Sequence, residues 1–206
     1  IGQSNYPAYE GVNTRGLNGC FWIRILDKQP NGELLIENLY DVGKIKVPQV
    51  QAVIEPDLVY PLLRGRDVGR WRAEPSAHLL LTQDPATRKG IPESEMKRRW
   101  PKTWAYLRQF EGDPAHPKRG ALRGRALFRQ YYKPEDPFYS MYNVGPYTMS
   151  KWKALWPEVG KSVRAGACGP AFVEQNKPSL PDHTIVAVSC KSGREAHYLA
   201  GLLNTS

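Results

Sequence analysis

The hydrophobic pattern of this chain changes its period at residue 91, and this change limits the folds open to it. Before residue 91 the apolar residues form short continuous or alternating runs, which are typical of β-strands. Beyond it, Met96, Trp100, Trp104, Leu107 and Phe110 recur at spacings of three or four, as on one face of an α-helix. Strands in the first half and helices interrupting the second predict an α+β fold, with mixed β-sheets and interspersed helices.

Individual elements follow from the same patterns. Residues 20–26 and 33–38 are apolar runs separated by the turn sequence QPNG, which predicts a β-hairpin. Residues 44–54 alternate but contain Pro48, which favours an edge strand, and residues 77–82 predict a buried strand. The other predicted elements are two helices at 91–112 broken at Pro101, a helix at 121–132, strands at 151–157 and 184–190, and a final helix after the capping-box pair Ser192 and Glu195.

The chain has 206 residues, and we expect one domain spanning residues 1–206. The Pro- and Gly-rich stretch at 111–120 is predicted to be an exposed loop or a hinge. The first residues, IGQSNYPAYEG, lack an initiator Met and the features of a signal peptide. We therefore expect the chain to be a piece of a larger protein.

The balance of charge indicates the kind of partner. The 29 Lys and Arg against 20 Asp and Glu give a net charge of +9, which favours a polyanion such as DNA, RNA or an acidic membrane surface. No apolar run approaches the roughly 18 residues that a membrane span needs. Three scattered cysteines are typical of a reducing compartment, so we expect a cytoplasmic protein.

Three patterns resemble catalytic or metal sites without their full geometry. Asp57, Glu95 and Lys97 imitate a metal-dependent nuclease motif, but Glu95 and Lys97 are two residues apart on a predicted helix and do not share a face. The quartet DPFY at 136–139 lacks the second proline of a methyltransferase motif. Cys168, His183, Cys190 and His197 are too widely spaced for a typical zinc site, so we expect no metal and no catalytic residue in the chain.

Positive charge is clustered rather than spread. Residues 58–75, LVYPLLRGRDVGRWRAEP, place Arg64, Arg66, Arg70 and Arg72 on a short segment punctuated by glycines. Two further segments, 114–134 and 139–153, combine Lys and Arg with tyrosine and tryptophan. Arginine binds phosphates bidentately, and aromatic side chains can stack on bases, so these segments predict contacts to nucleic acid.

Several motifs together resemble a known family. They are G-V-N-T-x-G-x-N at 11–18, P-L-L-R-G-R-D-V at 61–68, DPFYSMYNVGPYT from residue 136 and the ending L-L-N-T-S at 202–206. In this order they resemble the C-terminal target-recognition domain of adenine-N6 DNA methyltransferases, of the type IIG or Taq-type restriction–modification enzymes. The first motif departs from that family at Arg15, where a glycine is usual.

The resemblance implies a domain that binds double-stranded DNA sequence-specifically and has no activity of its own. An N-terminal catalytic domain of the same chain would bind S-adenosylmethionine, flip out an adenine and methylate it. We predict that DNA contacts come from Arg64, Arg66, Arg70 and Arg72, from a second loop, and from a weaker set. The second loop contributes Thr14, Arg15 and Asn18, and the weaker set is Tyr142, Asn143, Lys151 and Lys153. Asp67 is predicted to orient a neighbouring arginine.

Two alternatives stay open. One is a metal-dependent nuclease that uses Asp57, Glu95 and Lys97. The other is a protein-interaction domain whose charge is incidental. A DNA-recognition domain should bind DNA less tightly as salt rises, because counterion release accompanies each phosphate contact. A protein-interaction domain with incidental charge should not bind DNA in this way.

Overall fold

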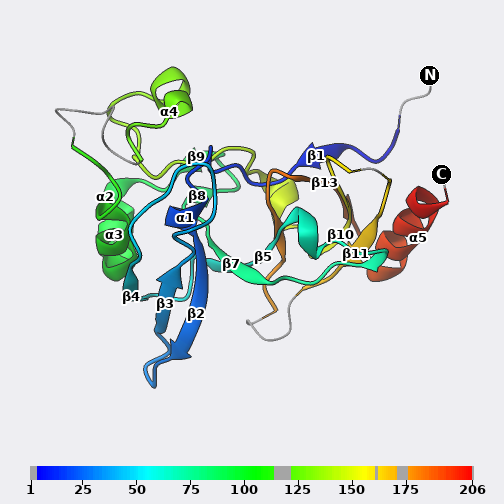
Figure 1. Ribbon diagram of the computed structural model, residues 1–206, viewed down its shortest axis with the longest axis horizontal. Helices are drawn as coiled ribbons and strands as arrows, with labels where there is room; N and C mark the ends of the chain where they lie inside the picture. Colours follow the sequence, from blue (N-terminus) through cyan, green and yellow to red (C-terminus); the bar gives the residue numbers. More distant parts are fainter. Residues whose placement is uncertain (1–3, 114–121, 161, 171–175, 206) are drawn as a thin grey trace. The chain divides into compact units, whose positions relative to one another are not determined.

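A computed structural model of the protein describes residues 4–113, 122–160, 162–170 and 176–205 (Figure 1). Its mixed sheets and interspersed helices confirm the predicted α+β fold. The chain forms two compact units that are interleaved in sequence. Unit 1 comprises Ile1–Asn13, Tyr60–Ala77 and Asn143–Ser206, and unit 2 comprises Thr14–Val59 and His78–Tyr142. The prediction of one recognition domain stays a prediction, and residues 114–120 of the predicted hinge lie outside the described residues.

Unit 1 is built on a five-stranded sheet in the order β1-β13-β10-β11-β6. Its strands pair antiparallel except for β6, which runs parallel to β11. The bounds are β1 Ala8–Glu10, β6 Trp71–Arg72, β10 Trp152–Pro157, β11 Gly166–Cys168 and β13 Ile185–Cys190. Unit 1 also contains all but the first residue of β5 (Val59–Leu63), which runs parallel to β12 (Leu180–Pro181). The 3-10 turns η1 (Gly65–Asp67) and η2 (Pro146–Met149) belong to the same unit.

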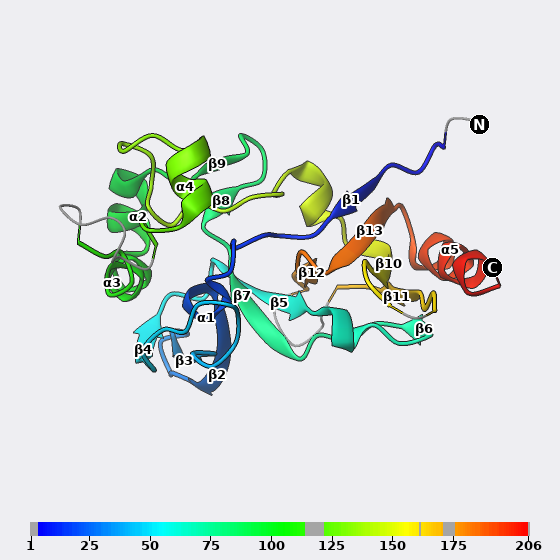
Figure 2. The same ribbon diagram turned by 45° about the horizontal axis from the view of Figure 1, so that its top comes forward.

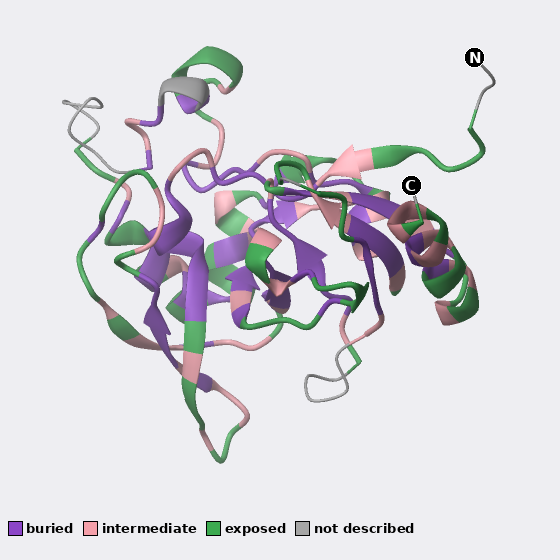
Figure 3. Cartoon of the chain, turned by 45° about the vertical axis from the view of Figure 1, so that its right-hand side comes forward, coloured by how far each residue is buried: buried purple, intermediate pink, exposed green. Residues whose placement is uncertain are grey.

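Both faces of this sheet are covered. On one face α5 (Gly193–Asn204) packs its buried Ala196 and Ala200 against Ala154 of β10 and Val188 of β13. Figures 1 and 2 show α5 beside β10 and β11, and Figure 3 shows that its outer side is exposed. The opposite face is closed by a second cluster that includes Leu63, Val68, Ala73, Leu155, Cys168, Ile185 and Ala187. Both faces of β10, the strand predicted at residues 151–157, therefore pack against apolar side chains.

Unit 2 contains the predicted hairpin, formed by β2 (Trp22–Lys28) and β3 (Leu34–Asn38), whose tip is exposed (Figure 3). β4 (Gln51–Ile54) pairs with β3, and β7 (Ala77–Leu80) pairs with β2. The other elements of the unit are α1 Asn18–Phe21, β8 Gln83–Asp84, β9 Lys89–Gly90, α2 Glu93–Arg99, α3 Pro101–Arg108 and α4 Ala126–Tyr131.

The predicted break at Pro101 is confirmed, since α2 and α3 are separate helices that meet at Trp100. Pro101 stands at the first position of α3, where a missing backbone N–H costs nothing. The Glu55 carboxylate accepts from the backbone N–H groups of Lys102 (3.0 Å) and Thr103 (2.8 Å), so it caps this helix from the end of β4.

Two predicted elements are shorter than expected. The strand predicted for 44–54 is limited to β4, and the segment before it is held by the Asn38 side chain, which bonds the Pro48 carbonyl and the Val50 N–H. The helix predicted for 121–132 covers only α4, with Arg125 in an extended conformation before it. Among the described helices, none has the length and apolar character that crossing a bilayer requires.

Candidate nucleic-acid interface

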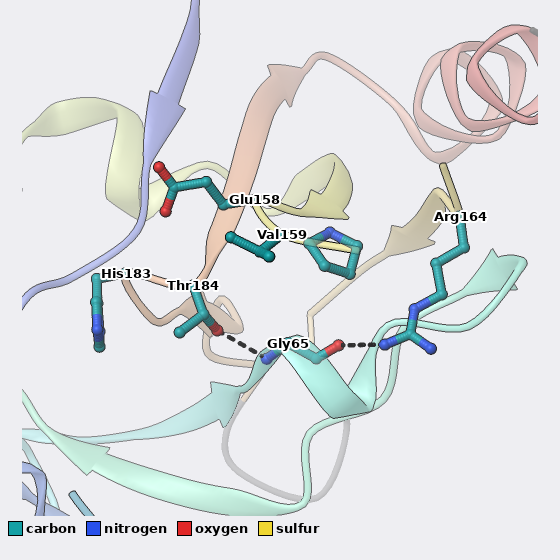
Figure 4. Close-up of a pocket in the computed structure, with 7 residues that line it drawn as sticks. Gly65, Glu158, Val159, Arg164, His183 and Thr184 are labelled. Atoms are coloured by element: carbon teal, nitrogen blue, oxygen red, sulfur yellow. Dashed lines mark hydrogen bonds between the residues drawn. The ribbon is translucent and has the colours of Figure 1, made fainter. Parts of the chain in front are cut away.

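The arginine-rich segment forms a loop of unit 1, residues 64–76, which we call the arginine loop. It follows β5 and contains η1 and β6. Its start is fixed by two contacts to Gly65, shown in Figure 4. The Gly65 N–H donates to Thr184 Oγ1 (3.1 Å), and its carbonyl accepts from Arg164 Nη2 (3.2 Å). A Cβ at position 65 would lie 2.9 Å from Thr184 Oγ1, so glycine permits this close approach.

Arg64 is buried inside the arginine loop, with only 8% of its surface exposed. Its Nε lies 3.4 Å from Asp67 Oδ2, and its Nη2 donates to Ser76 Oγ. The Asp67 carboxylate also accepts from the Arg64 backbone N–H (2.8 Å) and from Ser76 Oγ. Asp67 therefore occupies the orienting position predicted for it. Arg64 ties the start of the loop to its end, and we leave it out of the proposed DNA contacts.

Arg66, Arg70 and Arg72 are exposed on the same loop. Arg72 forms an ion pair with Glu74, but 77% and 65% of these two side chains are exposed. Ion pairs of this kind contribute only about 0–1 kcal/mol, so a phosphate can displace Glu74 at little cost. Three guanidinium groups are thus presented to solvent by a loop that its own hydrogen bonds hold in place.

Unit 2 carries the second candidate group, Thr14, Arg15, Asn18 and Tyr142. Thr14 and Asn18 are buried, and the Thr14 hydroxyl donates to the Asn18 side-chain oxygen. The Arg15 guanidinium lies 4.9 Å from the centroid of the Tyr142 ring. Arg15 has a φ of +55°, the left-handed conformation that favours glycine. The backbone therefore has a glycine-like conformation at the position where the motif at 11–18 differs from the motif that it resembles.

The remaining candidates belong to unit 1. Asn143 is half-buried and donates to Glu10 Oε2 (2.9 Å), whereas Lys151 is exposed. Lys153 is fully buried on the face of β10 opposite α5. Its Nζ donates to the carbonyls of Ser150 and Ser179, the latter at 2.9 Å. A phosphate cannot reach Lys153 in this position, and we leave it out of the proposed contacts.

Burial lowers the pKa of Lys153 to about 8, because its charge is removed from water. The unfolded chain still binds this proton up to a pKa near 10.4. The folded state is therefore destabilised relative to the unfolded state below pH 8, and the free energy of unfolding of the wild type rises with pH between the two pKa values.

We expect the difference in free energy of unfolding between Lys153→Met and wild type to change by about 1.4 kcal/mol per pH unit in this window, in favour of wild type as pH rises. Urea unfolding at pH 7, 8, 9 and 10 measures it, and a difference constant with pH would contradict the prediction.

Two residues of the nuclease pattern, Glu95 and Lys97, form ion pairs within α2. Glu95 pairs with Arg99 (2.9 Å), and Lys97 pairs with Glu93 (3.5 Å) and lies over the Trp104 ring. In the described part of the chain, no three His, Cys, Asp or Glu side chains are grouped as metal ligands.

Two further residues belong to the arginine loop or contact it. Arg164 is exposed and reaches Gly65 from the segment before β11, nearly a hundred positions away in sequence. Trp71 lies within the arginine loop, and its position between two arginines is the sequence signal that distinguishes it. A small pocket of about 260 Å³ beside the loop is lined by Gly65, Pro157, Glu158, Val159, Arg164, His183 and Thr184.

Comparison with known proteins relates the chain to a type II DNA methyltransferase. It is 26% identical over 154 residues to the type II methyltransferase M.NspV of Nostoc sp.. The match covers 74% of this chain and 28% of that relative, so the chain spans less than a third of the relative's length. No protein-family model matches the chain.

Proposed function

We propose that the chain is a recognition module that binds double-stranded DNA for an S-adenosylmethionine-dependent adenine-N6 DNA methyltransferase. The observation that carries the proposal is the arginine loop, which exposes Arg66, Arg70 and Arg72 on a frame built by Arg64, Asp67 and Ser76. The relation to M.NspV supports the connection with DNA methylation. A net charge of +9 adds a general attraction to the phosphate backbone.

Phosphate binding and base recognition are expected to involve different residues of the chain. Guanidinium groups fix a protein on the phosphates, but phosphate contacts carry no sequence information. In this proposal the arginine loop of unit 1 positions the duplex, and Asn143 of the same unit is a candidate for a base contact. Arg15 and Tyr142 of unit 2 are candidates in their own right. We assign no residue of the chain to S-adenosylmethionine or to methyl transfer, which belong to the proposed N-terminal catalytic domain.

Salt dependence of binding tests the proposal. Each neutralised phosphate contributes a slope of about −0.9 to the plot of log affinity against log salt, so three arginines predict a slope of about −3 or steeper. Replacing Arg66 with alanine is expected to weaken binding to all duplexes and to reduce the slope by about 0.9. Fluorescence anisotropy with labelled duplexes measures both quantities.

Arg98 provides the matched control, because it is an exposed arginine on α2, outside the arginine loop. Arg98→Ala removes the same charge and is expected to leave the slope close to that of the wild-type chain. A slope unchanged by Arg66→Ala would remove Arg66 from the phosphate contacts, and wild-type binding without salt dependence would contradict the proposed function.

A further inference from the structure

Trp71 has two unfavourable features, an exposed aromatic ring and a left-handed backbone conformation. Its side chain is 54% exposed, although large aromatic side chains are usually well buried. Its φ is +76°, in the left-handed region where a bulky residue is an outlier. Strained backbone of this kind persists when the surrounding structure enforces it, and it clusters at functional sites.

The neighbouring strand β11 enforces this conformation. The Trp71 N–H donates to the Ala165 carbonyl (2.9 Å), and the Ala73 N–H donates to the Ala167 carbonyl (3.0 Å). Between them, Gly166 approaches the arginine loop so closely that an added Cβ would lie 2.8 Å from the carbonyl carbon of Arg72. The position of Trp71 is therefore set by hydrogen bonds on both sides and by a backbone contact that only glycine allows.

The charges around Trp71 indicate what its ring would meet. Arg70 and Arg72 flank it in sequence, and both are exposed. An exposed aromatic ring between cations is the arrangement by which proteins bind single-stranded nucleic acid, with the ring on a base and the cations on the backbone. In a paired duplex the faces of the bases are covered by their neighbours, so a ring stacks most readily where a base has left the stack.

We infer that Trp71 stacks on a nucleobase displaced from the duplex, while Arg70 and Arg72 bind the flanking phosphates. The inference rests on the proposed function and adds a preference to it. The chain should bind a duplex with one unpaired base more tightly than the same duplex fully paired. Stacking on one base corresponds to a preference of about tenfold.

Competition binding of the 206-residue chain to the two duplexes tests this. The wild-type chain is expected to prefer the duplex with the unpaired base, Trp71→Phe to keep part of the preference, and Trp71→Ala to bind both duplexes equally. The salt slope should be the same in all three, because no charge is removed. Tyr198→Ala is the control, since Tyr198 is an exposed aromatic residue of unit 1 on α5 (64% exposed) and should leave the preference intact.

The outcomes separate the inference from the proposed function. A wild-type chain that binds neither duplex overturns both. Salt-dependent binding with a preference that survives in Trp71→Ala, or with no preference in the wild type, overturns the inference alone. Trp71→Gly controls for a loss of preference caused by misfolding, because glycine adopts a φ of +76° without strain. It is expected to stay folded by circular dichroism and to lose the preference, and a folded Trp71→Gly that keeps the preference also overturns the inference.

Discussion

Replacing Arg66, Arg70 and Arg72 together with alanine is expected to lower the affinity for duplex DNA by about a thousandfold at low salt. All three side chains are exposed, so their loss leaves no buried group unpaired and no cavity. A hydrogen bond to a charged group contributes about 1.5 kcal/mol or more, and three such contacts together correspond to a factor of this size. The salt slope should fall by about 2.7 in the same variant.

A second triple variant separates this effect from a general loss of charge. Lys28, Arg98 and Arg194 are also exposed but lie outside the arginine loop. Replacing them with alanine lowers the net charge from +9 to +6, as the loop variant does, since each removes three positive charges. Equal losses of affinity in the two variants would show that net charge, and not the arginine loop, provides the binding. Thermal unfolding of both variants checks that the fold is retained.

Much of the fold could be predicted from local sequence patterns, because these patterns depend on interactions between residues close together in the chain. The hairpin, the helix break at Pro101 and the strand at 184–190 each follow from periodicity, turn residues or proline geometry. The Ser192 side chain accepts from the Glu195 N–H (3.2 Å), as the capping-box pattern predicts. The division into two interleaved units was not predicted, because it depends on contacts between segments far apart in the chain.

The candidate site could be predicted only in outline. Arg64 and Arg66 are two positions apart with similar neighbours, yet the first is buried and the second exposed. The difference arises from Ser76, which lies twelve positions beyond Arg64 and completes the hydrogen bonds that bury it. Lys153 lies two positions from Leu155 and therefore on the same face of β10, but the sequence does not show that this face is covered.

Arg125 is the clearest example of a charged side chain whose burial could not be predicted from the sequence. The sequence places it in a basic stretch that suggests a solvent-exposed surface, but only 2% of it is exposed. Its guanidinium donates to the carbonyls of Leu122 (3.0 Å), Thr14 (3.4 Å), Phe138 (2.8 Å) and Ser140 (2.9 Å). Burial lowers its pKa to about 10, which still leaves it charged at neutral pH. One side chain thus joins three separate segments of unit 2.

Arg125→Met is therefore expected to destabilise the protein by about 4 kcal/mol or more. Methionine fills a similar volume but donates no hydrogen bond, so the four carbonyls lose this donor inside the protein, where an unsatisfied polar group is costly. Arg125→Lys should recover only a part of the loss, because the three N–H groups of one ammonium cannot reproduce the planar fork of the guanidinium.

Arg129→Met is the matched control, since Arg129 is exposed on α4, four positions further along the chain. It is expected to change the free energy of unfolding by less than about 0.5 kcal/mol. Urea unfolding followed by tryptophan fluorescence measures all three variants against wild type. Similar stabilities for Arg125→Met and Arg129→Met would mean that the carbonyls around Arg125 find other donors, and that the buried guanidinium is not what joins Thr14 to the segment from Phe138 to Ser140.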